Sequence, residues 1–170
     1  MEGNFMESKF SMSVVLAVFT MLLIIPVTNA SAAAQILSWH LVDSGKHLDW
    51  GGSTKYQSYF DSGVNVWNGY KKGVIRKDTI FTIEDVRISD YTEKSNTAGV
   101  TSSAGTIKFN KYTMDKLTST QKKNVAIHEL GHALGLAHNT SNDVMYKYVS
   151  TNTTLSSNDK ASYDASYKRY

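Results

Sequence analysis

The chain has 170 residues, with 18 Lys and Arg against 15 Asp and Glu, a formal net charge of +3 and no cysteine. This length fits one domain with at most a short processed segment, and apolar and charged fractions of 41% and 19% are typical of a folded globular protein. The lack of cysteine excludes a disulfide framework, a thiolate nucleophile and a cysteine-ligated metal site. The small, scattered positive charge gives no reason to expect nucleic acid as a partner.

Residues 1–32 have the composition of a secretory signal peptide. The segment 14–27 is apolar apart from one Thr and one Pro, and its 14 residues are too few to cross a bilayer as a helix. Two overlapping Ala-x-Ala patterns in residues 30–34 match a signal-peptidase site. We therefore expect cleavage, no stable membrane span after processing and a secreted domain of residues 33–170. An uncleaved membrane anchor and a buried core helix are the alternatives.

The remaining sequence predicts an α+β pattern. From Thr54 onward, apolar residues recur every three or four positions, which predicts a helix that ends before Gly73. The predicted strands are rich in β-branched or aromatic residues and are bounded by turn residues. They are Trp39–Val42, Lys46–Trp50, Thr79–Ile83, Val86–Ser89, Gly99–Ser103 and Thr106–Asn110, the last two forming a hairpin.

Two further helices carry capping signals in the sequence. Thr118-x-x-Gln121 has the form of a capping box, in which a hydroxyl and an amide serve the first free backbone donors of a helix. This helix should end at Gly135. Ser156-x-x-Asp159 is a second capping signal, and it predicts a last helix with two tyrosines on one face.

The candidate catalytic and metal-binding residues lie on, or just after, the helix that Thr118 begins. His128 and His132 are four residues apart, so their side chains project from the same side of a helix. Gly135 can adopt the left-handed conformation that ends a helix, and the chain can then return to bring His138 to the same place. The alternative is that these residues form an ordinary polar face of a helix. The joint occurrence of five residues at fixed spacing on a capped, glycine-terminated helix argues against it: His128, Glu129, His132, Gly135 and His138.

This residue set suits one catalytic zinc ion. Three neutral histidines, His128, His132 and His138, leave one position of a tetrahedral zinc open, which is the arrangement of a catalytic rather than a structural site. Zinc lowers the pKa of bound water and polarises a substrate carbonyl. Glu129 is adjacent to a ligand without being one, and it can act as the general base that takes a proton from that water.

The segment from His128 to His138 resembles the extended zinc signature of the metzincin metalloproteases, His-Glu-x-x-His-x-x-Gly-x-x-His followed by a Met-turn. The sequence from Asp143 to Tyr146 resembles that turn, with Met145 seven residues after His138. Its adjacent Met and Tyr are similar to the matrixin branch. Weaker similarity to secreted bacterial matrixins extends over residues 39–167.

The resemblance implies a metzincin catalytic domain. Such a domain has a twisted five-stranded mixed sheet with an antiparallel edge strand, an active-site helix and a small C-terminal part with a last helix. The edge strand, here Gly99–Ser103, binds substrate backbone by strand addition. The resemblance therefore implies substrate contacts for Gly99, Val100, Thr101 and Tyr146, and a packing role for Met145 beneath the zinc. A calcium site is not evident from the sequence.

These observations predict a monomeric, secreted zinc endopeptidase that hydrolyses proteins or peptides with Glu129 as general base. One alternative is a zinc-binding module of the same fold without proteolytic activity. Another is a zinc hydrolase that acts on a substrate other than protein. The presence of Glu129 counts against the binding module, because a binder has no need of a base.

Overall fold

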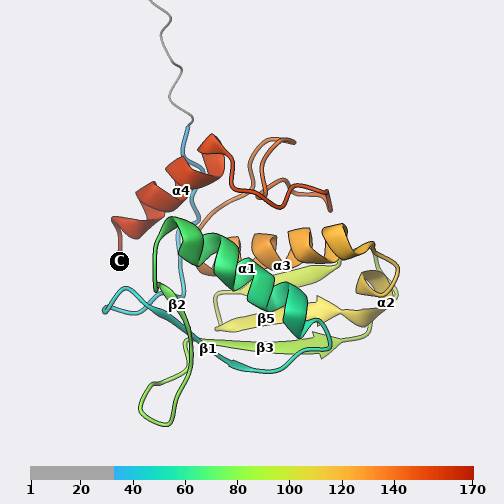
Figure 1. Ribbon diagram of the computed structural model, residues 1–170, viewed down its shortest axis with the longest axis horizontal. Coiled ribbons are helices and arrows are strands. Elements are labelled where there is room, and N and C mark those ends of the chain that lie inside the picture. The colour runs from blue at the N-terminus through green and yellow to red at the C-terminus, as the bar shows by residue number, and fades with distance from the viewer. Residues whose placement is uncertain (1–32) are drawn as a thin grey trace, which may run out of the picture. The chain divides into compact units, whose positions relative to one another are not determined.

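The computed structural model describes residues 33–170 (Figure 1). The proposed signal peptide, residues 1–32, lies outside the described residues. Within residues 33–170, no helix combines the length and the apolar character needed to cross a membrane.

Five strands and four helices make up the described chain. The strands are β1 (Leu48–Gly52), β2 (Ile75–Lys77), β3 (Val86–Tyr91), β4 (Gly99–Ser102) and β5 (Thr106–Asn110). The helices are α1 (Gln57–Tyr70), α2 (Lys111–Met114), α3 (Ser119–Ala133) and α4 (Ser157–Tyr167).

The strands form one mixed sheet in the order β2-β1-β3-β5-β4. The β1–β2, β1–β3 and β3–β5 pairs are parallel, whereas β4 runs antiparallel to β5 at the edge of the sheet. Gly105, with φ 78°, lies in the tight turn that joins β4 to β5. The α+β class and the five-stranded mixed sheet with an antiparallel edge strand are confirmed.

The core lies between one face of the sheet and the two long helices α1 and α3, which lie side by side over that face (Figure 1). Alternate residues of β3 and β5, such as Ile88 and Phe109, are fully or almost fully buried, as expected where one face of a sheet is covered. Trp67 of α1 has no exposed surface, and its indole N–H donates a 2.9 Å hydrogen bond to the carbonyl of Ile127 on α3. This bond and the packing around it hold α1 against the helix that carries the site.

Both predicted capping boxes are confirmed. The Thr118 hydroxyl accepts from the backbone N–H of Gln121, and the Gln121 side chain accepts from the backbone N–H of Thr118. Ser156 and Asp159 make the same reciprocal pair at the start of α4. Loss of such a cap typically costs about 1 kcal/mol of stability.

Two of the predicted strands are wrong. Residues 39–42 do not pair with the sheet; instead the backbone N–H of Leu41 donates to the carbonyl of Ala133 at the end of α3. Residues 79–83 form an exposed loop, in which the Thr82 hydroxyl accepts from the backbone N–H of Thr79 at 2.7 Å. Ile80, Phe81 and Ile83 are at least 90% exposed there, because this segment lies beyond the last β1–β2 pair and no strand of the described chain lies beside it.

Several boundaries also differ from those predicted. The strand expected at Lys46–Trp50 occupies Leu48–Gly52, and β2 at Ile75–Lys77 was not predicted. The first helix begins at Gln57 rather than near Thr54, because the Thr54 hydroxyl accepts from the backbone N–H of Tyr56 before the helix starts.

Candidate active site

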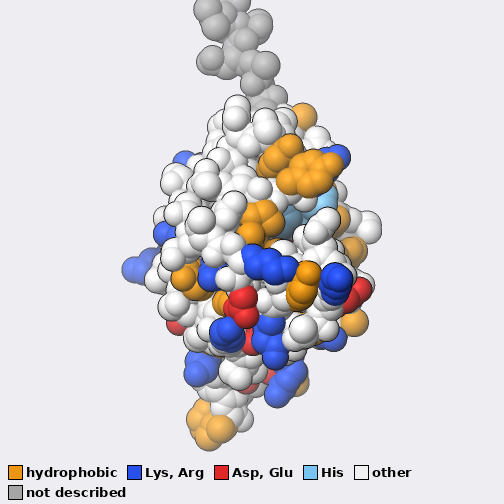
Figure 2. Space-filling model, turned by 90° about the vertical axis from the view of Figure 1, so that its right-hand side faces the viewer, with side chains coloured by type: hydrophobic (Ala, Val, Ile, Leu, Met, Phe, Trp, Pro, Cys, Tyr) orange, Lys and Arg blue, Asp and Glu red, His pale blue; other side chains and the backbone are white. Residues whose placement is uncertain are grey.

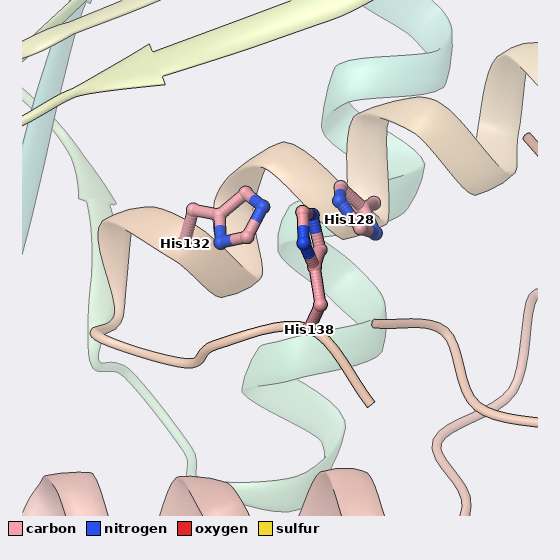
Figure 3. A group of neighbouring side chains, drawn as sticks. All are labelled: His128, His132 and His138. Carbon is pink, nitrogen blue, oxygen red and sulfur yellow. The ribbon is translucent and has the colours of Figure 1, made fainter. Parts of the chain in front are cut away.

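Three histidines from two consecutive segments lie together. His128 and His132 project from α3, and His138 comes from the segment that follows it (Figure 3). One ring nitrogen of each lies within 4.8 Å of those of the other two. The ring centroids are 4.6 Å apart for His128 and His132, 5.3 Å for His128 and His138, and 4.9 Å for His132 and His138.

Gly135 makes the reversal that brings His138 back. Its φ of 87° lies in the left-handed region, which glycine adopts without a steric penalty. The N–H of Gly135 donates to the carbonyl of His132 at 2.9 Å, and the N–H of Leu136 donates to that of Gly131 at 3.0 Å. This pair of bonds is the Schellman motif that ends a helix, so the predicted stop is confirmed.

Hydrogen bonds orient two of the imidazoles. Nδ1 of His128 lies 2.9 Å from the carbonyl oxygen of Val144, and Nδ1 of His132 lies 2.8 Å from that of Leu136. Since a carbonyl oxygen only accepts, each Nδ1 carries the proton. Nε2 of each ring is then the nitrogen with a free lone pair.

The three histidines are electrically suited to bind a cation. Burial lowers the pKa of His128 and of His132 to about 4, and it also lowers the pKa of His138. All three imidazoles are therefore neutral near pH 7, as metal ligation requires. Neutral nitrogen ligands, two of them oriented by a carbonyl on the opposite ring nitrogen, fit a zinc ion.

Glu129 lies beside this group and is buried, with 5% of its surface exposed. Its Oε2 accepts a 2.6 Å hydrogen bond from the hydroxyl of Thr101 on β4. Burial raises the pKa of Glu129, against the opposing effects of His132 and of the Thr101 hydrogen bond. A raised pKa brings a carboxylate closer to the pH at which it can both take and return a proton.

Met145 lies directly beneath α3 and is fully buried. A Cβ added to Gly131 would lie 2.3 Å from the Met145 sulfur, so the absence of a side chain at Gly131 lets Met145 pack against the helix between His128 and His132. Asp159 of α4 stabilises the turn that contains Met145, because its carboxylate accepts from the backbone N–H groups of Val144 at 2.9 Å and Met145 at 3.2 Å. The sequence indicated only a capping role for Asp159.

A cleft of about 480 Å³ is lined by the three histidines and Glu129. Figure 2 shows histidine side chains in a hollow of this face, with hydrophobic side chains beside them. The four residues implied as substrate contacts all line the cleft: Gly99, Val100, Thr101 and Tyr146. Thr101, however, also bonds to Glu129, a role that the strand pattern alone did not indicate.

A group of acidic side chains, separate from the histidine group, comes together away from the cleft. Carboxylate oxygens of Asp43, Asp49 and Asp85 lie within 4.8 Å of one another, which the sequence did not reveal. The guanidinium of Arg76 donates to both oxygens of Asp49 at 2.7 and 2.8 Å, and Asp85 accepts from the backbone N–H of Asp49. Arg76 thus supplies a positive charge to the group.

Comparison with known proteins agrees with this geometry. Residues 77–168, more than half of the chain, match the family model of the matrixins, Peptidase_M10. The matched region contains β3, β4, β5, the histidine group and the turn at Met145. No curated protein matches the chain. The chain therefore belongs to the matrixin family of metalloproteases, whose members normally bind zinc.

Proposed function

We propose that this chain is a zinc-dependent endopeptidase that hydrolyses internal peptide bonds of proteins or peptides. The observation that carries the proposal is the convergence of three neutral imidazoles and one buried carboxylate on a single cleft. His128, His132 and His138 would hold the zinc ion. When bound, the ion supplies a Lewis acid for the substrate carbonyl and an acidified water molecule.

The protein's own groups supply the remaining functions. Glu129 accepts a proton from the attacking water and later donates it to the nitrogen of the departing amine, so the proton count balances. Within residues 33–170, edge strand β4 has one side free of other strands, and an extended substrate can pair with its backbone there. Tyr146, which follows Met145, also lines the cleft.

The test is hydrolysis of mixed protein substrates in a gel, with and without a metal chelator. The proposal expects cleavage that the chelator abolishes and added zinc restores. A protein that binds zinc but cleaves no protein substrate would instead be the zinc-binding module. Cleavage of a non-protein ester or amide alone would indicate the third class, a zinc hydrolase with another substrate.

We further propose that the enzyme is secreted after removal of residues 1–32 and is of the secreted bacterial type. The short apolar segment followed by two Ala-x-Ala sites supports secretion. The resemblance to secreted bacterial matrixins over residues 39–167 supports the bacterial type. Amino-terminal sequencing of protein recovered from the culture medium should find Ala33, or Gln35 if the second site is used. An intact Met1 or Met6 on membrane-bound protein would instead indicate an uncleaved anchor.

A further inference from the structure

The residues of β4 alternate between the two faces of the sheet. Thr101 faces α3, since its hydroxyl reaches the backbone and the side chain of Glu129. Gly99 faces α3 as well, because a Cβ there would meet the Glu129 side chain. Val100, between them, is 43% exposed. Two positions of this edge strand therefore border the carboxylate of Glu129.

The Thr101 hydroxyl is the one hydrogen-bond donor to the Glu129 carboxylate within residues 33–170. Its Oγ1 lies 2.6 Å from Oε2 and 2.9 Å from the backbone carbonyl oxygen of Glu129. A hydrogen bond to a charged group is worth more than one between neutral groups, and a buried charge is costly without it. The hydroxyl thus fixes the rotamer of Glu129 through its hydrogen bond to Oε2.

Gly99 leaves the space in which the other half of the carboxylate lies. A Cβ on Gly99 would come within 2.7 Å of Cγ, 2.8 Å of Oε1 and 2.9 Å of Cδ of Glu129. The φ of Gly99 is outside the left-handed region, so the backbone itself does not require glycine here. The requirement comes from the position of Glu129.

From these contacts we infer that Thr101 is a positioning residue for the catalytic base, and that Gly99 and Thr101 together determine where the Glu129 side chain lies. The inference rests on the proposed peptide hydrolysis. With Oε2 held by Thr101, Oε1 is the oxygen free to exchange a proton with water and with the leaving amine. Because substrate would pair with this same strand, one element sets both the path of the substrate backbone and the position of the base.

The first experiment compares Thr101→Val, Thr101→Ser and the control Thr106→Val. Valine keeps the shape of threonine without the hydroxyl, and serine keeps the hydroxyl. Thr106 lies on the neighbouring strand β5, opposite Ser102. We expect Thr101→Val to lower kcat by about 10- to 100-fold with KM and zinc content nearly unchanged, the range expected for loss of a hydrogen bond to a charged group. Thr101→Ser should recover most of kcat, and Thr106→Val should retain it.

The second experiment measures urea unfolding of the metal-free protein, and so does not depend on activity. Thr101→Val should lower the unfolding midpoint when Glu129 is present and have a smaller effect when Glu129 is replaced by Ala. Such non-additivity is the signature of a direct interaction between the two side chains. Gly99→Ala should likewise be less destabilising in the Glu129→Ala background, because the side chain that it would strike is then absent.

Normal kcat in Thr101→Val, or a Thr101→Ser protein as impaired as Thr101→Val, would overturn the inference. Additive effects in the unfolding cycle would overturn it as well. If the unmodified protein hydrolyses no protein substrate, the proposed function fails instead. The unfolding cycle still decides whether Thr101 positions the Glu129 side chain.

Discussion

Replacing Glu129 with Ala should give a protein that binds zinc like the unmodified chain but hydrolyses peptides at least about 10²-fold more slowly. All three imidazoles remain, and the two with defined Nδ1 bonds keep their carbonyl partners on Val144 and Leu136. What is lost is the group that moves the proton, and general acid–base catalysis typically contributes about 10²–10⁴-fold. The loss should appear mainly in kcat, because the base acts in the transition state.

The measurement is kcat together with zinc content on the same preparation. Glu129→Gln is the closer variant, since its side chain has the same length and can still accept a hydrogen bond from Thr101. Glu93→Ala is the matched control, because this glutamate is exposed and does not line the cleft. Near-normal turnover of zinc-loaded Glu129→Ala or Glu129→Gln would refute the proposed role of the carboxylate.

The His138→Ala variant should lose most of its bound zinc and with it the activity. His138 is the one member of the group that does not lie on α3, and its imidazole depends on the reversal at Gly135 to reach the other two. Loss of a group that merely supports a ligand typically weakens metal binding by 10- to 100-fold, so loss of a ligand should weaken it by more than about 100-fold.

Elemental analysis after dialysis against a weak chelator measures this loss. His47→Ala is the control, because His47 lies outside the histidine group, near Asp43. An unchanged zinc content in His138→Ala would remove this residue from the site and leave only the two helical histidines. The same measurement on His132→Ala should show a comparable loss, because this variant also keeps only two of the three imidazoles.

The parts of this protein that the sequence predicted correctly depend on contacts between residues close together in the chain. The spacing of His128 and His132 puts them on one side of any helix. The Thr118 capping box is formed between residues three apart, and Gly135 ends its helix through local backbone conformation. The antiparallel pairing of β4 with β5 follows from a hairpin joined by a tight turn at Gly105.

The tertiary structure alone decided which of the β-branched segments became strands. A strand requires a partner, and the segment 79–83 has none among the residues that the structure describes, whereas the three residues of β2 pair with β1. It also decided what surrounds the site. Thr101 meets Glu129 across 28 positions of sequence, and Asp159 meets Met145 across 14. Side-chain chemistry shows that a buried carboxylate needs donors, but only the packing of β4 and α4 against the site determines which residues supply them.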